Sequence, residues 1–163
     1  MMTKFRAIGL LFSLNLLVLA ACSPAPTIDD DVLGQAEIIN LREPEPDIMS
    51  SGQPTEDQFR LLAEAGVRHV INLRPLDEQD WDEATLVRSL NMEYHHIPVA
   101  GGDDITRENA QALYDLLESV AGEPVIIHCA SGNRVGALIA LSAQQNQGLD
   151  ADAALAEGER WGL

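Results

Sequence analysis

The sequence predicts a single α/β domain in which helices flank a mostly parallel central sheet. The clearest evidence is a Val-Ile-Ile-His run at residues 125–128, which lies between Pro124 and a turn containing Gly132. A short, apolar and β-branched run of this kind is typical of a central strand buried on both faces. Other short apolar runs alternate with segments of helical periodicity, which indicates parallel strands joined by helices. The length fits one domain with a core of its own.

The elements before residue 100 follow this alternation. Thr55 and Gln58 hold the two positions of a capping box, and Gly66 ends the helix that they begin. Pro75 closes the strand that comes next. In order, we expect this strand, a second helix and another strand at residues 67–73, 80–90 and 92–99.

The second half of the domain begins with a helix that Thr106 caps. Apolar residues recur along it at spacings of three and four, which places them on one face. They are Ala110, Leu113, Leu117 and Val120. The strand at 125–128 comes next, and further helices are expected at residues 135–145 and 151–157.

The amino-terminal segment has the pattern of a secretion signal. Lys4 and Arg6 precede an apolar run over residues 7–20, which is too short and wrongly flanked to span a membrane. Residues 19–22, Leu-Ala-Ala-Cys, resemble the lipobox of bacterial lipoproteins. This resemblance implies cleavage before Cys22 and lipidation of that cysteine.

These features divide the chain into three parts. We expect a lipoprotein signal peptide at residues 1–21, a tether rich in Pro and Asp at 22–35, and the folded domain at 36–163. The expected location is the bacterial cell envelope, with the domain anchored by lipid and facing the periplasm. Ser23 is compatible with the outer membrane. The alternative is an ordinary cleaved signal peptide in which Cys22 has no special role.

The charge of the chain argues against two kinds of partner. The sequence has 26 acidic and 10 basic residues, for a formal net charge of −16. Such an acidic excess disfavours binding to nucleic acid and electrostatic adhesion to anionic lipid. The lipid anchor is therefore the one contact with a membrane that the sequence predicts.

Residues 128–134, His-Cys-Ala-Ser-Gly-Asn-Arg, have the organisation of an anion-binding loop. A buried strand delivers Cys129 to the sheet edge where ligands bind in open α/β domains. Gly132 permits a turn in which backbone N–H groups converge with the N-terminus of the next helix. Arg134 adds a planar fork for two oxygens of one phosphate or sulfate. The expected binding residues are Ala130, Ser131, Gly132, Asn133 and Arg134.

Cys129 is the one cysteine besides Cys22, so the mature domain cannot form an internal disulfide. The field of the helix terminus and Arg134 favours the thiolate form of Cys129, and hence a reactive nucleophile. The alternative is a structural thiol, since cysteine is among the most buried residue types. In that case Arg134 is an ordinary solvated helix residue.

The loop resembles the His-Cys…Gly…Arg signature of cysteine-dependent phosphatases, and segments upstream extend the resemblance. They are Ser51-Gly52-Gln53-Pro54, Ile71-Asn72-Leu73-Arg74 and Tyr94-His95-His96-Ile97-Pro98-Val99. In this order, over residues 38–141, they resemble the phosphatase-like domain of beta-lactamase-hydrolase-like proteins, a bacterial branch similar to dual-specificity phosphatases. The resemblance implies a phosphatase fold, with Cys129 as nucleophile and Arg134 as phosphate ligand. It also implies hydrolysis of a phosphate monoester through a phosphocysteine intermediate.

The sequence departs from the wider phosphatase pattern at two points. Four residues separate Cys129 from Arg134 where that pattern has five, and Val135 offers no hydroxyl to assist the second chemical step. The four-residue spacing is that of the active loop of rhodanese sulfurtransferases. Two alternatives therefore stay open: a sulfurtransferase that carries a persulfide on Cys129, and a non-catalytic module that binds an oxyanion or a partner.

A phosphatase also needs a general acid, and Asp103 and Asp104 are the candidates. They lie in a Gly-rich loop that we expect at the same sheet edge; the alternative is that both are solvated loop acids. We expect His128 to point away from the ligand side and to orient the loop through a hydrogen bond. Arg74 is expected to make a structural contact.

The sequence predicts neither a metal nor a cofactor. His95 and His96 lie on a strand, and with a single cysteine in the domain and no ligand spacing they do not indicate a metal site. The expected partner is a substrate that bears a phosphate or another oxyanion.

Overall fold

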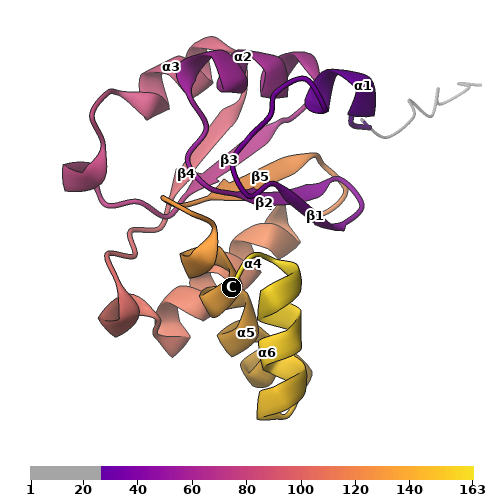
Figure 1. Cartoon of the computed structure of the whole chain (residues 1–163). Helices are drawn as coiled ribbons and strands as arrows, with labels where there is room; N and C mark the ends of the chain where they lie inside the picture. Colours follow the sequence, from indigo (N-terminus) through magenta and orange to yellow (C-terminus); the bar gives the residue numbers. More distant parts are fainter. Residues whose placement is uncertain (1–26) are drawn as a thin grey trace, which may run out of the picture.

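The structure, a computed structural model, describes residues 27–163. The expected signal peptide and Cys22 lie outside the described residues. The body is a five-stranded sheet with helices on both faces (Figure 1). Its strands are β1 Arg42–Glu45, β2 Ile48–Ser51, β3 His69–Asn72, β4 Glu93–His96 and β5 Val125–His128.

The strands lie side by side in the order β1-β2-β5-β3-β4. The four strands from β2 to β4 in this order are parallel, and β1 pairs with β2 in the antiparallel sense. All four residues of β5, the central strand, are buried. The predicted α/β fold with a mostly parallel sheet is confirmed.

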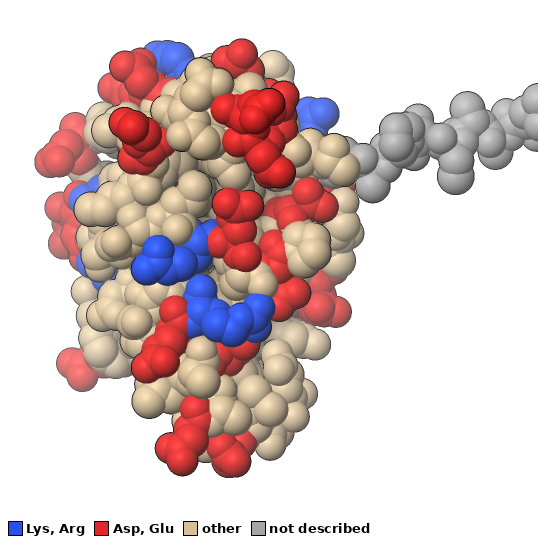
Figure 2. Space-filling view, turned by 45° about the vertical axis from the view of Figure 1, so that its right-hand side comes forward, with Lys and Arg blue, Asp and Glu red and all other residues tan. Residues whose placement is uncertain are grey.

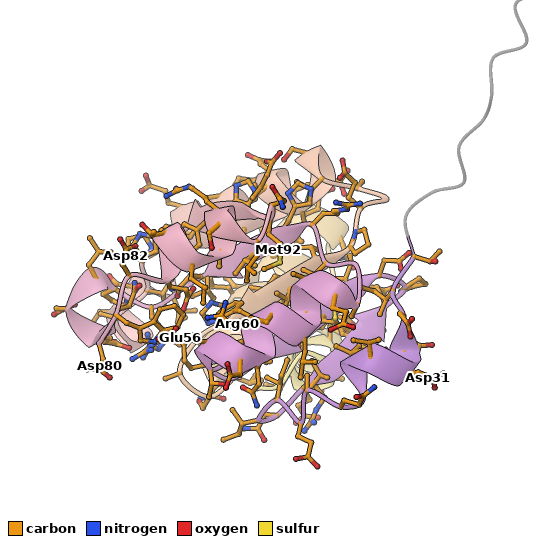
Figure 3. The ribbon with its side chains drawn as sticks, turned by 90° about the horizontal axis from the view of Figure 1, so that it is seen from above. Asp31, Glu56, Arg60, Asp80, Asp82 and Met92 are labelled. Carbon is orange, nitrogen blue, oxygen red and sulfur yellow. The ribbon has the colours of Figure 1, made fainter. Side chains whose placement is uncertain are left out.

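The helices form one layer on each face of the sheet (Figure 1). The layer of α1, α2 and α3 is seen from above in Figure 3, where Glu56 and Arg60 lie on the outer surface of α2. The layer on the other face contains α4, α5 and α6. The helices are α1 Asp30–Leu33, α2 Glu56–Glu64, α3 Glu83–Ser89, α4 Arg107–Ser119, α5 Asn133–Gln147 and α6 Ala151–Arg160, with 3-10 turns η1 Leu76–Glu78 and η2 Gly102–Asp104.

The sheet separates two apolar clusters. Phe59 of α2 packs with Ile126 of β5 on one face, and Leu138 of α5 packs with Ile127 on the other. Adjacent residues of β5 thus enter opposite cores, as the alternation of a strand requires. Among residues 27–163, none of the helices combines the length and the apolar composition that crossing a membrane requires.

The amino-terminal part of the domain differs from the expectation. The expected tether includes residues 30–33, but these form α1. Asp29 caps this helix by accepting hydrogen bonds from two backbone N–H groups of its first turn. Leu33 is buried against the first core. The folded body therefore begins ahead of the expected boundary, because one capping aspartate and one buried leucine dock the segment.

The β1–β2 hairpin is the second difference. Pro44 and Pro46 lie in a run of charged residues, which gives no alternating strand pattern. In the structure β1 is an edge strand, where proline is tolerated. Asp47 makes the turn with a φ of 59°, a left-handed conformation that aspartate adopts more readily than most residues.

The last turn of the chain packs against the rest of the domain at very close range. A Cβ atom added to Gly136 of α5 would lie 2.3 Å from the backbone nitrogen of Leu163 and 2.5 Å from the carbonyl oxygen of Gly158. The hydroxyl of Ser50, on β2, donates to the carbonyl of Trp161 at 2.8 Å. The carboxyl end of the chain is therefore fastened to α5 and to β2.

Candidate active site

The loop after β5 directs a backbone N–H group at the sulfur of Cys129. The N–H of Gly132 donates to Sγ at 3.1 Å, and the cysteine side chain is fully buried. Gly132 has a φ of 94°, in the left-handed region that favours glycine, and α5 begins at the next residue. The turn thus sets the amino end of a 15-residue helix beside the sulfur, which is the arrangement of an anion-binding loop.

The segment around the end of β2 holds this loop in place. The carbonyl of Ser51 accepts from the N–H of Cys129 at 3.3 Å, and the N–H of Gln53 donates to the carbonyl of Ala130 at 3.2 Å. The side-chain amide of Asn40 donates to the carbonyl of Ser131 at 2.9 Å. Two of these three contacts use carbonyl oxygens of the loop, so they restrain it without occupying the N–H groups that an anion would need.

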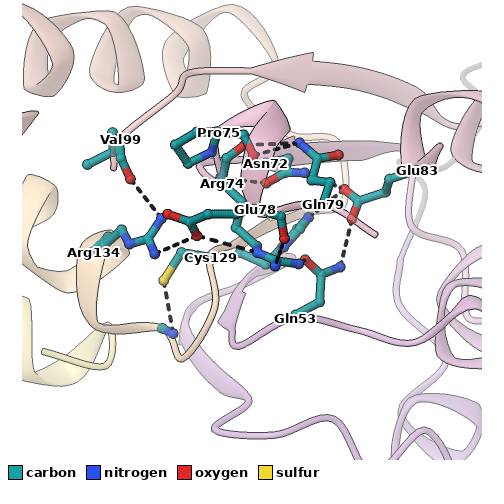
Figure 4. Close-up of polar contacts among 12 residues, drawn as sticks. Gln53, Asn72, Arg74, Pro75, Glu78, Gln79, Glu83, Val99, Cys129 and Arg134 are labelled. Carbon is teal, nitrogen blue, oxygen red and sulfur yellow. Dashed lines mark hydrogen bonds and ion pairs between the residues drawn. The ribbon is translucent and has the colours of Figure 1, made fainter. Parts of the chain in front are cut away.

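Arg134 is turned toward the sheet edge and not toward bulk solvent. Its Nη1 donates to the carbonyl of Val99 at 2.7 Å, and its Nη2 donates to the carboxylate of Glu78 at 2.7 Å (Figure 4). The Arg134 side chain is only 20% exposed. The structure therefore disagrees with the alternative of a solvated helix arginine, because two separate segments hold the fork beside the Cys129 loop.

Glu78, at the end of η1, is the main feature of the site that the sequence did not indicate. Its carboxylate lies between two guanidinium groups, 2.7 Å from Nη2 of Arg134 and 3.7 Å from Nε of Arg74 (Figure 4). Arg74 also donates to the backbone carbonyl of Glu78 and to the side chain of Gln53. Arg74 thus makes the structural contact expected of it. An acidic side chain, meanwhile, engages the fork expected to bind phosphate.

A buried polar network lies on the other side of β5. The carboxylate of Glu83, 2% exposed, contacts Nε2 of His128 at 2.8 Å. It also accepts from the side-chain amides of Asn72 at 2.9 Å and Gln53 at 2.6 Å. Burial raises the pKa of the neighbouring Tyr94 hydroxyl, and the Glu83 charge raises it further. His128 therefore points away from Cys129, as predicted, and its hydrogen bond goes to α3.

The loop after β4 approaches the same site. Gly101 and Gly102 line a cavity of about 340 Å³ together with Ser131, Asn133 and Arg134. Asp104 is engaged locally, since its carboxylate accepts from the N–H of Ala100 at 2.8 Å.

Asp103, next to it in η2, is exposed. The structure therefore gives the two candidate acids different surroundings. Asp104 holds its own loop, and Asp103 is the one whose carboxyl group faces water.

The molecule as a whole is strongly acidic, with a formal net charge of −16. In the view of Figure 2, red acidic side chains are spread over the visible face and blue basic ones form small groups. An approaching anion is therefore repelled by the molecule as a whole, and attraction depends on local donors such as Arg134.

Comparison with known proteins agrees with this geometry. Residues 31–160 match the model of a family described as "DSP-PTPase phosphatase fused to NAD+ Kinase". The chain belongs to this phosphatase family. The matched region includes all five strands, Cys129 and Arg134.

Related proteins carry names of the same kind. A beta-lactamase hydrolase-like protein of Xylella fastidiosa is 38% identical over 98 residues, which are 56% of this chain and 22% of that protein. The dual specificity protein phosphatase TpbA of Pseudomonas aeruginosa is 30% identical over 129 residues, which are 77% of this chain and 56% of TpbA. The chain thus spans about a fifth of the first relative's length and just over half of the second's.

Solved structures show the same fold. The crystal structure of a putative phosphatase (DUF442) from Shewanella putrefaciens has a TM-score of 0.63 and 30% identity, and the similarity covers 83% of this chain and 87% of that one. The active form of Tk-PTP has a TM-score of 0.64 with coverage of 75% and 84%, but at 20% identity this likeness concerns the fold alone. The resemblance to a phosphatase domain is confirmed, whereas lipid anchoring and the roles of individual site residues stay predictions.

Proposed function

We propose that this chain is a cysteine-dependent phosphatase that hydrolyses a phosphate monoester through a phosphocysteine intermediate. The observation that carries the proposal is the N–H of Gly132 at 3.1 Å from the Cys129 sulfur, with Arg134 held beside the same loop. Membership of the phosphatase family supports the same chemistry.

The reaction has two displacement steps. In the first, the thiolate of Cys129 attacks phosphorus, the new P–S bond forms and the P–O bond to the leaving group breaks. The leaving oxygen takes its proton from a general acid. In the second, water attacks the phosphocysteine and gives a proton to the carboxylate that acted as the acid, the P–S bond breaks, and inorganic phosphate leaves with the thiolate restored. Loop N–H groups and Arg134 stabilise the charge on the non-bridging oxygens in both steps.

Asp103 is our candidate for the general acid. Its exposure allows it to take up and release protons with solvent, and its loop lines the cavity beside Arg134 through Gly101 and Gly102. Asp104 would act instead as a positioning residue, because its carboxylate binds the backbone of the same loop.

Glu78 would exchange with the substrate. A phosphate on Arg134 needs the two N–H groups that now bind Glu78 and Val99. The phosphate carries more charge than a carboxylate and gains the loop N–H groups as well, so it competes for the fork. Glu78 in turn keeps Arg134 oriented and partly neutralised until substrate arrives.

The short loop keeps a second candidate in view, a sulfurtransferase with a persulfide on Cys129. Four residues separate the cysteine from Arg134, and this spacing matches the rhodanese loop noted above. A non-catalytic oxyanion-binding module is the third, since no hydroxyl follows Arg134 to assist phosphocysteine hydrolysis.

The deciding experiment measures both reactions side by side. The full chain and its Cys129→Ser variant are assayed for phosphate release from aryl phosphates and for thiocyanate formation from thiosulfate and cyanide. We expect phosphate release that Cys129→Ser abolishes, with no thiocyanate. Thiocyanate without phosphate would replace the proposal with the sulfurtransferase, and neither product, with oxyanion binding retained through Arg134, would leave the binding module.

We also propose that Cys22 carries lipid and holds the domain in the cell envelope, facing the periplasm. The support is the Leu-Ala-Ala-Cys ending of the apolar run. Cys22→Ser should move the protein from the membrane fraction to the soluble fraction. An unchanged membrane fraction, together with no incorporation of labelled fatty acid into the wild type, would refute the anchor.

A further inference from the structure

A second cluster of ligand-type side chains lies at the opposite edge of the sheet. His69 begins β3 and pairs in register with Glu93, which begins β4, and His95 follows two residues later on the same face of that strand. His69 of β3 pairs in register with Val125 of β5, and Cys129 comes four residues after Val125, which is about 13 Å along a strand. The cluster is therefore separate from the candidate active site.

Three atoms of this cluster have the spacing of metal ligands. Nδ1 of His69 lies 3.3 Å from Nε2 of His95, and Oε2 of Glu93 lies 3.7 Å and 3.9 Å from these nitrogens. A point equidistant from three atoms so separated is about 2.1 Å from each, which is the usual length of Zn–N and Zn–O bonds. One ion could therefore reach all three atoms, and small side-chain movements would open the tetrahedral geometry that zinc prefers.

A fourth residue supports the ligand geometry of His69. Its other ring nitrogen, Nε2, lies 3.3 Å from the carboxylate of Glu123, in the connection from α4 to β5. When a carboxylate accepts the Nε2 proton, the neutral ring must present a lone pair at Nδ1, the atom that faces Glu93 and His95. A histidine ligand held by a carboxylate behind it is the usual outer arrangement of protein metal sites.

We propose that His69, Glu93 and His95 bind a divalent transition-metal ion of the zinc type, with Glu123 as a positioning residue. Two neutral imidazoles and a carboxylate suit such an ion, and at least one coordination position is left for water. Without an ion, one of the facing imidazole nitrogens has to carry a proton between them; with an ion, both offer lone pairs. The charges of Glu93, on the ion, and of Glu123, behind His69, offset that of the dication, so the cluster is close to neutral.

The proposal reverses the expectation of no metal site drawn from the sequence. That expectation looked for ligands at short spacings, whereas these come from the start of β3 and from β4, and their positioning residue comes from the segment before β5. Binding would join edge strand β4 to β3 and to the α4–β5 connection, so its first consequence is stability of this edge of the sheet.

The test is a zinc titration of a full-length chain that has no thiol. Cys22→Ser and Cys129→Ser remove both cysteines of the sequence, so thiolate binding cannot contribute. In this background we expect one equivalent of Zn²⁺ by calorimetry, a rise in melting temperature, and shifted NMR signals from the rings of His69 and His95. Co²⁺ provides an optical check of the ligand set.

Variants separate the proposed site from non-specific binding. His95→Gln should weaken Zn²⁺ binding at least 100-fold and remove the thermal shift, while Glu123→Gln should weaken it about 10–100-fold. His96→Gln, on the other face of the same strand, is the matched control and should leave binding unchanged. If His95→Gln does not fold, Glu93→Gln, at an exposed position, is used in its place and should also weaken Zn²⁺ binding. Failure of the background protein to bind Zn²⁺, or equal binding by background and ligand variants, would overturn the proposal.

Discussion

Two adjacent residues at the end of β5, His128 and Cys129, face opposite sides of the sheet and lie in different environments. His128 faces α2 and α3 and joins a buried polar network, while Cys129 faces α4 and α5 among apolar side chains. Because hydrogen bonds depend on direction, the contact with Glu83 restrains the side chain of His128 at the end of β5. On the apolar side, the Cys129 sulfur accepts a hydrogen bond from the N–H of Gly132, next to the helix terminus. The buried polar network and the proposed nucleophile thus lie on opposite faces of one strand.

Removing the acceptor at the centre of the buried polar network, Glu83, should have the largest effect on stability. Glu83→Ala strips the shared acceptor from His128, Asn72 and Gln53, and leaves the buried Nε2 of His128 without a partner, while Asn72 and Gln53 keep their bonds to the Tyr94 hydroxyl and the Pro54 carbonyl. We expect a loss of about 3–5 kcal/mol in the free energy of unfolding, measured by urea denaturation. Glu64→Ala, at an exposed position of α2, is the matched control and should change stability little. A loss for Glu83→Ala no larger than this control would show that the network does not hold the strand.

Replacing Asp103, the proposed general acid, tests the proposed reaction without changing the Glu83 network. Asp103→Asn should lower turnover of alkyl phosphates by about 10²–10⁴-fold, and that of an activated aryl phosphate less, because its leaving group needs little protonation. Asp104→Asn keeps a side chain able to accept the Ala100 N–H and should have a much smaller effect. The reverse ranking, measured as kcat for both substrates, would assign the acid to Asp104.

The close contact of α5 with α6 offers a stability test on the apolar side. Gly136→Ala would push a methyl group into the backbone of Gly158 and Leu163. We expect a loss of about 1–3 kcal/mol in thermal or urea unfolding. Gly101→Ala meets no atom within 4 Å and provides the control. Wild-type stability for Gly136→Ala would mean that α6 packs less tightly than described.

The smallest expected effect concerns Glu78, the carboxylate that we propose competes with substrate for Arg134. Glu78→Gln removes the charge bound to Arg134 but keeps the size of the side chain. We expect KM to fall about two- to fivefold, as for a partly exposed ion pair, with kcat nearly constant. A rise in KM would instead mean that Glu78 is needed to orient Arg134 for binding.

Much of the fold follows from the sequence because its signals are local. The capping box of Thr55 and Gln58 is present, with Thr55 N–H to Gln58 Oε1 at 2.8 Å. The apolar run of β5 is also buried as predicted. The β1–β2 hairpin and α1 were not predicted, since prolines and a four-residue helix leave no periodic pattern.

In the candidate site, too, the residues of one local motif were predicted and those distant in sequence were not. Cys129, Gly132 and Arg134 lie within one short motif, and the sequence identifies them together. Glu78 is 56 residues from Arg134, and only the approach of η1 to α5 pairs them. Its place after β3, at the edge where Cys129 emerges, is the one sequence signal that could have identified it. The cluster of His69 and His95 gave no signal for the same reason.

The contacts of the last turn, Trp161 to Leu163, also suggest how the protein would lose activity on partial unfolding. Trp161 is hydrogen-bonded to Ser50, and the next residue of β2, Ser51, holds the N–H of Cys129. Gly162 lies against the backbone of Gly132, where an added Cβ would be 3.6 Å from its carbonyl oxygen. Detachment of α6 alone, a sub-global opening, would therefore release the loop while the sheet stayed folded. On mild heating or in low denaturant, we expect activity to be lost before the cooperative unfolding of the domain begins.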